Sequence, residues 1–250
     1  MTALGRRNPR LALLPIALLT AVWAVTSVLA LILTHRDSGP FYATALLFLV
    51  PSFFFLLFIW NEFNRFWSVG LRGADTHVRT GVNYDAALKL VREQLAFLGT
   101  GAAKLTNQPA FEKALTKCRP DEPIKFLLMR PDAVNLERAA RRAGRDRDDY
   151  KKIVLRSLQI LTDYRINREM RIEVRFYSGE STFRLMFIDD SLCLASYNVY
   201  GEGDGSDFPQ LHVMSRSTVT RSFYYAFRRH FDLLWEASEE WDFNSYLGQV

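Results

Sequence analysis

Cysteine and histidine are scarce in this chain. Its 250 residues include two cysteines, Cys118 and Cys193, and four histidines. No Cys-x-x-Cys pair occurs, which excludes a thiolate-rich zinc site. Internal repeats and low-complexity segments are also missing. Most of the chain is therefore expected to form one globular domain with its own hydrophobic core.

Charged residues are missing from two long stretches near the N-terminus. Neither Leu11–Thr34 nor Phe41–Trp60 contains Asp, Glu, Lys or Arg. Each stretch is long enough as a helix to cross a hydrocarbon layer of roughly 30 Å, and the first exceeds the apolar core of a signal peptide. The pattern predicts a two-helix transmembrane hairpin.

Basic residues flank the outer ends of both apolar stretches. They are Arg6, Arg7, Arg10, Arg65, Arg72 and Arg79. Because basic residues favour the cytoplasmic side, both termini are expected in the cytoplasm and the chain in the cell inner membrane. The expected parts are a cytoplasmic N-terminus (1–10), transmembrane helix 1 (11–34), an external loop (35–40), transmembrane helix 2 (41–60), a juxtamembrane linker (61–82) and a cytoplasmic domain (83–250). The formal net charge of +5 partly reflects this topology signal and does not by itself imply a nucleic-acid partner.

The cytoplasmic domain shows alternating helix and strand patterns. Continuous or alternating apolar runs predict strands at Gln94–Leu98, Ile124–Met129, Arg171–Tyr177, Phe183–Ile188 and Leu192–Tyr197. Helical spacing predicts helices at Tyr84–Arg92, Pro109–Cys118, Ala133–Tyr164 and Ser217–Trp241. This order predicts an α/β sandwich with a mixed sheet.

One stretch carries chemical information. Thr182, Arg184 and Asp189 have the spacing of a His-x-Lys motif followed four residues later by Asp. Ser196 and Asn198 then match a small-Ser-x-Asn turn. With the preceding strand, Gly turn, helix and Pro-Asp step, this pattern resembles the phospholipase D superfamily. The resemblance covers one half-domain, from about Val91 to Trp241.

The resemblance implies a phosphate-binding site without the catalytic histidine. Family members that cut phosphodiesters use a His as the nucleophile, and Thr182 stands in that position with no adjacent base in the sequence. Arg184 can hold a phosphate with its guanidinium or pair with a nearby acid. The ligand-binding candidates are Thr182, Arg184, Asp189, Ser196 and Asn198, with no catalytic residue, metal or cofactor expected.

Three functions follow from this combination. The first is a catalytically inactive phospholipase D-like sensor joined to a two-transmembrane effector, similar in architecture to bacterial antiphage effectors that oligomerise and disrupt the inner membrane. The alternatives are a membrane-bound phosphodiesterase or nuclease, and a structural membrane adaptor. Expected partners are the lipid bilayer, further copies in a homo-oligomer, and a nucleotide or nucleic-acid ligand or a partner protein encoded nearby.

A basic run and two histidines complete the candidates. The basic residues are Arg138, Arg141, Arg142, Arg145, Arg147, Lys151, Lys152 and Arg156. They can face anionic lipid or nucleic acid, but interspersed acids favour a solvated helix face with i,i+4 pairs. His212 and His230 start no His-x-Lys motif, and His230 is expected to be structural.

Overall fold

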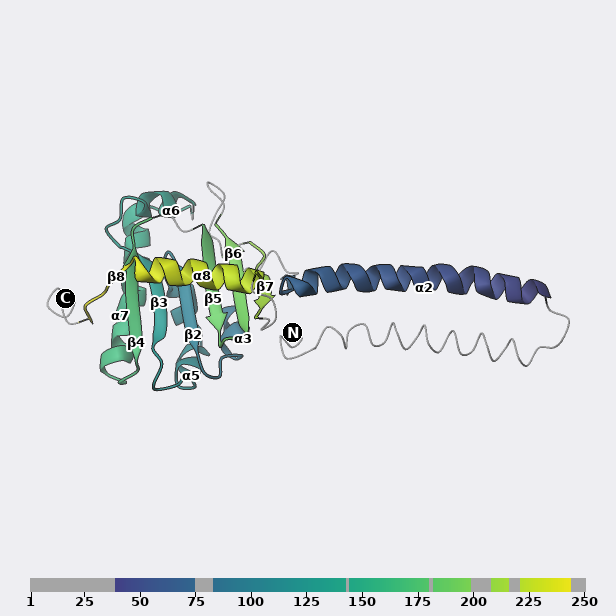
Figure 1. The fold of residues 1–250 in the computed structure, drawn as a ribbon. Helices are drawn as coiled ribbons and strands as arrows, with labels where there is room; N and C mark the ends of the chain where they lie inside the picture. The colour runs from purple at the N-terminus through teal and green to yellow at the C-terminus, as the bar shows by residue number, and fades with distance from the viewer. Residues whose placement is uncertain are drawn as a thin grey trace. The chain divides into compact units, whose positions relative to one another are not determined.

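The computed structural model describes residues 39–74, 83–142, 144–179, 182–198, 208–215 and 221–243. The chain divides into two compact units, 1–68 and 69–250. In the first unit, the structure describes one helix, α2 (Gly39–Ser68) (Figure 1). Several large apolar side chains of α2 are exposed, and Arg65 pairs with Glu62 at 2.9 Å near its C-terminal end.

The structure overturns the predicted transmembrane hairpin. Helix α2 begins inside the predicted external loop and continues past the second apolar stretch through Glu62 and Arg65, so it does not have the predicted bounds. In the part of the chain that the structure describes, no helix is long and apolar enough to cross a membrane. The first predicted span (11–34) lies outside the described residues. The predicted hairpin and its inner-membrane localisation are therefore wrong on this finding.

The second unit is built around a mixed sheet of eight strands in the order β1-β7-β6-β5-β2-β3-β4-β8. The central strands β2 (Leu95–Gly99), β3 (Ile124–Met129) and β4 (Ile172–Tyr177) are parallel. Strands β5 (Phe183–Ile188), β6 (Leu192–Tyr197), β7 (Leu211–Met214) and β1 (Leu71–Ala74) continue the sheet with antiparallel pairing. The two-residue strand β8 (Glu239–Glu240) pairs with the opposite edge, at β4.

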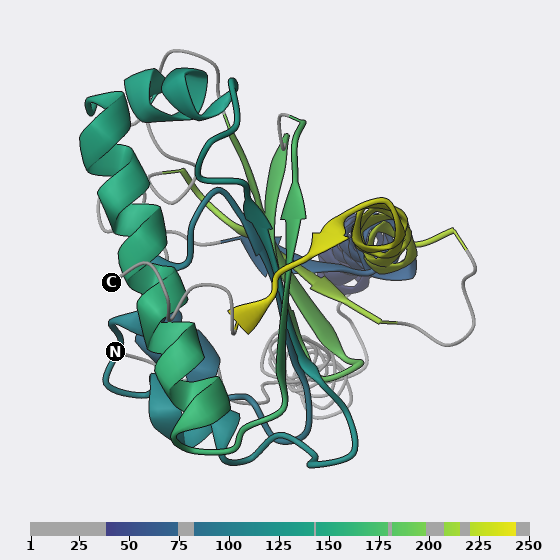
Figure 2. The same ribbon diagram turned by 90° about the vertical axis from the view of Figure 1, so that its left-hand side faces the viewer.

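Helices cover both faces of this sheet. The parallel connections contain α4 (Ala103–Thr106), α5 (Phe111–Leu115), α6 (Leu136–Arg142) and α7 (Arg147–Ile166), and α3 (Tyr84–Leu88) precedes β2. Figure 2 shows α7 on one face and α8 (Phe223–Glu236) on the other. The Phe111 ring contacts Phe126 and Tyr164 on the α7 face, whereas Phe187 contacts Phe231 on the α8 face. Each strand therefore has one row of side chains facing each helical layer.

The predicted mixed sheet with packed helices is present, and three strands have the predicted bounds. A continuous apolar run predicts β3, and apolar runs on both sides of a turn predict β5 and β6. The predicted helix 133–164 is instead two helices, separated at Gly144, whose φ of 63° a helix does not accept. In α8, the buried face consists of Tyr224, Phe227, Phe231 and Trp235, whereas Phe223 is 46% exposed.

Candidate functional site

Two residues of the predicted site face each other on neighbouring strands. Arg184 on β5 and Ser196 on β6 are register partners, and both are buried, at 5% and 3% exposure. The Arg184 guanidinium lies 6.0 Å from the ring of Tyr84, at the start of α3. Both side chains therefore lie on the face covered by α3 and α7, while the alternating neighbour Phe183 contacts α8 through Phe227.

A third buried polar side chain extends this arrangement onto β7. Ala195 pairs with Leu211, so the same register places Gln210 opposite Ser196. Gln210 is 1% exposed. On the other side of Arg184, Leu98 pairs with Leu185, and the next residue is Gly99, which presents no side chain beside the guanidinium. We call Arg184, Ser196 and Gln210 the polar row. With strands about 4.8 Å apart, it spans roughly 10 Å across β5, β6 and β7.

Ser196 and Gln210 contribute donors and acceptors to the polar row that have no partner within the described ranges of the chain. Ser196 Oγ and both side-chain polar atoms of Gln210 are buried and have no hydrogen-bond partner among the described residues. Leaving one such group unsatisfied costs about 1–3 kcal/mol, and native proteins contain few of them. Three unsatisfied atoms beside one buried guanidinium therefore mark a place where a polar ligand can supply the missing partners.

Thr182 and Asn198 lie at the outer end of the same hairpin. The Asn198 amide donates to the Thr182 carbonyl oxygen at 2.9 Å, so the two residues form the next pair beyond the β5–β6 ladder. Both are an even number of residues from the polar row, which places them on its face of the sheet. Thr182 is exposed and Asn198 is half-buried. The structure thus brings four of the five predicted site residues together.

Asp189, the fifth predicted residue, lies elsewhere and has a structural role. It follows the opposite end of β5, roughly 16 Å from Arg184 along the strand. Its Oδ1 accepts hydrogen bonds from the backbone amides of Arg92, Glu93 and Gln94 at 3.2, 2.9 and 3.0 Å. Its φ of 50° also sets the turn between β5 and β6. The Asp189 carboxylate therefore holds the backbone that leads into β2. It lies too far from Arg184 to take part in the polar row.

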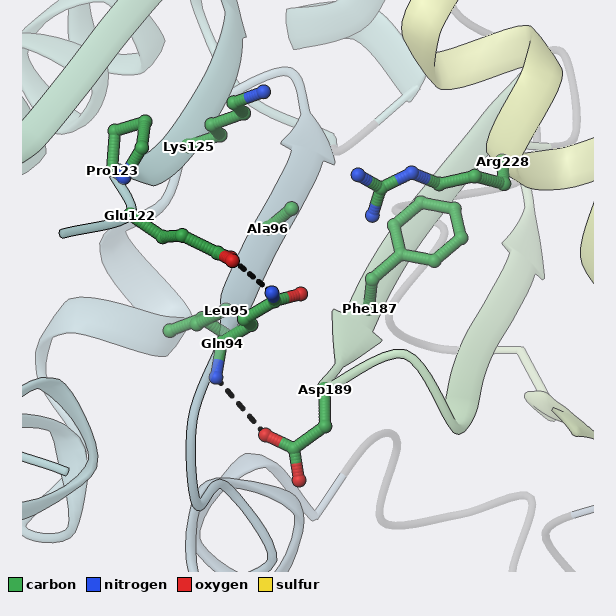
Figure 3. A pocket seen from close by; sticks show the side chains of 9 residues that line it. All are labelled: Gln94, Leu95, Ala96, Glu122, Pro123, Lys125, Phe187, Asp189 and Arg228. Carbon is green, nitrogen blue, oxygen red and sulfur yellow. Dashed lines mark hydrogen bonds between the residues drawn. The ribbon is translucent and has the colours of Figure 1, made fainter. Parts of the chain in front are cut away.

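A pocket of about 160 Å³ opens beside Asp189 (Figure 3). It is lined by Gln94, Leu95, Ala96, Glu122, Pro123, Lys125, Phe187, Asp189 and Arg228. Because the Phe187 ring packs against Tyr224 and Phe231 of α8, this pocket lies on the α8 side of the sheet. It is separate from the polar row, which faces α3 and α7 at the other end of β5.

The described histidines do not replace the missing catalytic one. His212 on β7 pairs with Leu194 and Gly73, two strands away from β5. His230 lies on α8, on the other face, with its ring 5.9 Å from that of Phe183. Burial lowers the pKa of His230 below its ordinary value. In the described part of the chain, no three His, Cys, Asp or Glu side chains converge to hold a metal ion.

The basic run is largely a solvated helix face. Arg141 pairs with Glu137 on α6, and Lys152 pairs with Asp149 at 3.2 Å on α7. All four side chains are about half exposed or more. The hydrogen bond from Arg141 lowers the pKa of Glu137. The Arg141–Glu137 contact is an i,i+4 pair of the predicted kind, whereas Lys152 and Asp149 pair at i,i+3.

Gln210 and Tyr84 are site residues that sequence reasoning missed. Gln210 is one residue before a four-residue strand, and its burial depends on pairing with β6. Tyr84 begins a short helix that is about 100 residues away from Arg184 in the sequence. Helical spacing predicts a helix that begins at Tyr84, but it does not indicate that Tyr84 lies beside Arg184.

Comparisons with known proteins do not identify the chain. No family model and no curated protein matches it. One solved structure, of TrmBL2, is described as an archaeal chromatin protein with a novel mode of DNA binding. It matches with a TM-score of 0.40 at 12% identity, over 80% of this chain and 70% of that one. So weak a likeness carries no argument, and the resemblance to the phospholipase D superfamily stays a prediction.

Proposed function

We propose that this chain binds a small phosphate-bearing ligand at the polar row and does not turn it over. The observation that carries the proposal is the buried Arg184 guanidinium beside three unsatisfied polar atoms of Ser196 and Gln210. A planar guanidinium is suited to bidentate contact with phosphate oxygens. The Ser196 hydroxyl and the Gln210 amide are further donors, so all three side chains suit one anion.

The position of the polar row in the fold supports a ligand site. It adjoins the end of β2, where the parallel part of the sheet meets the antiparallel part at β5. Ligands of open α/β sheets commonly bind beyond the carboxyl ends of parallel strands where the strand order changes direction. The preceding order of β2, α4, α5, β3, α6 and α7 also fits the expectation drawn from the phospholipase D resemblance.

The absence of turnover is proposed from the residues around Thr182. Its hydroxyl needs a base to become a nucleophile. Of the described histidines, His230 is on the opposite face and His212 is two strands away from β5. The antiphage effector role also stays a prediction, and the present proposal does not depend on it or on a membrane.

Calorimetric titration of the full chain with inorganic phosphate, then with mononucleotides and dinucleotides, tests the proposal. We expect saturable binding that Arg184→Lys weakens about tenfold, because lysine keeps the charge but loses the bidentate fork. Arg145→Lys, at an exposed position, is the matched control. If none of these ligands binds saturably, the proposal is refuted and a structural adaptor is favoured. Dinucleotide cleavage that Thr182→Ala abolishes would instead favour a phosphodiesterase.

A further inference from the structure

We propose that the pocket beside Asp189 binds a small zwitterion, specifically a free α-amino acid with a short side chain. This site is independent of the proposed phosphate site. It lies on the α8 side of the sheet and at the other end of β5 from Arg184. The inference rests on the positions of the cationic donors and of the acceptor oxygens that line the pocket.

One side of the pocket provides cationic donors. Arg228 pairs with Asp232 through Nε at 3.3 Å, and its guanidinium lies 5.4 Å from the Phe187 ring. Neither Nη group has a hydrogen-bond partner among the described residues, and Figure 3 shows the guanidinium above the Phe187 ring, pointing toward Ala96. Lys125 adds a second cation, whose Nζ lies 5.3 Å from the Trp235 ring. This side suits a carboxylate.

The other side of the pocket provides acceptors. Gln94 Nε2 donates to Glu122, so the amide oxygen of Gln94 is left for a ligand (Figure 3). Asp189 uses Oδ1 for three backbone amides, and its Oδ2 has no hydrogen-bond partner in the described ranges. The Gln94 amide oxygen is therefore the acceptor for an ammonium group, and the Asp189 carboxylate, whose Oδ2 points away from Gln94 in Figure 3, adds negative charge to this side of the pocket.

The balance of charge selects a ligand that carries both signs. Two cations, Lys125 and Arg228, and two carboxylates, Glu122 and Asp189, line the pocket. A simple anion would meet the carboxylates, and a simple cation would meet the guanidinium. A zwitterion satisfies both sides without adding net charge. The volume of about 160 Å³ suits a small ligand.

Differential scanning fluorimetry and calorimetry of the full chain with glycine, alanine and serine test this inference. We expect saturable binding of at least one free amino acid. Its N-acetyl and carboxamide derivatives should bind at least about tenfold more weakly, because each lacks one of the two charges. This comparison uses the unmodified protein and does not depend on any variant folding.

Variants then assign the binding to the pocket. Arg228→Met keeps the apolar stem over Phe187 and should weaken amino-acid binding about tenfold, whereas the exposed neighbour Arg229→Met should not. Phosphate binding should be unchanged in Arg228→Met, and amino-acid binding unchanged in Arg184→Lys, so either proposal can fail alone. The inference is overturned if no free amino acid binds saturably, if the blocked derivatives bind equally well, or if Arg228→Met binds like the wild type.

Discussion

Arg184 and Ser196 are direct cross-strand partners in the middle of the sheet, and both are almost fully buried. A guanidinium and a hydroxyl are costly to remove from water unless their hydrogen bonds are replaced. The Ser196 hydroxyl has no such replacement among the described residues, and neither does the side chain of Gln210 in the adjoining position. The buried polar atoms of Ser196 and Gln210 therefore reduce the stability of the fold, a pattern that is common at functional sites.

Replacing Ser196 with alanine should separate stability from binding. Because Ser196→Ala removes an unsatisfied buried hydroxyl, it should stabilise the ligand-free protein by about 1 kcal/mol and weaken phosphate binding. Urea denaturation with and without phosphate measures both effects. A purely structural serine would behave differently: its loss would destabilise the fold and leave the response to phosphate intact.

Gln210→Met should also stabilise the ligand-free protein and weaken phosphate binding, and both effects should be larger than in Ser196→Ala. Methionine has a similar length, and it removes two buried polar atoms that have no partner in the described part of the chain. We expect the midpoint of thermal unfolding to rise in the absence of ligand, and the stabilisation by phosphate to be lost. Gln108→Met, at a site where the glutamine amide donates to Lys104 at 2.8 Å, serves as a control without this gain. A lower midpoint for Gln210→Met would contradict the assignment.

Asp189 should prove to be a structural residue. Asp189→Ala removes the acceptor for three backbone amides and should cost about 2 kcal/mol of unfolding free energy. Asp189→Asn keeps Oδ1 and tolerates a positive φ, so its cost should be smaller. Chemical denaturation of both variants provides the comparison. Equal losses would show that the carboxylate charge, and not the hydrogen bonds, stabilises this turn.

His230 should make the protein less stable in mild acid. Burial lowers its pKa below the ordinary value of 6.5, so the unfolded chain takes up a proton near that pH more readily than the folded chain does. Stability therefore rises with pH through this window and is lost as the pH falls below about 6.5. Denaturation at a series of pH values should show this slope in the wild type and a reduced slope in His230→Phe. An unchanged slope in the variant would assign it to other groups.

The two cysteines should react more slowly than an ordinary exposed thiol. Burial raises the pKa of Cys118 to about 12 and raises that of the fully buried Cys193 as well. Since the thiolate is the reactive form, both should react slowly with a thiol reagent at neutral pH in the folded protein. Cys118 is half-buried, so it should react first. Labelling followed by mass spectrometry measures the order, and rapid labelling of Cys193 without denaturant would contradict the structure.

Much of the sheet was predictable because its strands carry local signals. Strand β3 is a continuous apolar run between turn residues, and the β5–β6 hairpin has apolar strands on both sides of Asp189 and Asp190. The edge strands β1 and β8 carry no such signal. Their four and two residues become strands only by pairing with β7 and β4.

The candidate site was only partly predictable, because some of its residues are brought together by strand pairing that leaves no local signal in the sequence. The spacing of the phospholipase D-like motif selects Thr182, Arg184, Ser196 and Asn198 as candidates, and the register of the β5–β6 hairpin places them on one face of the sheet. Spacing alone did not distinguish a ligand-binding carboxylate from one that caps backbone amides, so the role of Asp189 required the structure. Gln210 required the β6–β7 register, a relation between residues that lie far apart in the sequence.

The most direct test of the central claim is nitrogen NMR of the arginine side chains in the full chain during titration with inorganic phosphate. Arg184→Lys assigns the Arg184 Nε resonance by its disappearance. The account predicts a saturable shift of that resonance, with a reduced shift in Ser196→Ala, while exposed arginines show no saturable change. An Arg184 resonance that shows no saturable shift with phosphate would contradict it, whether or not other arginines respond.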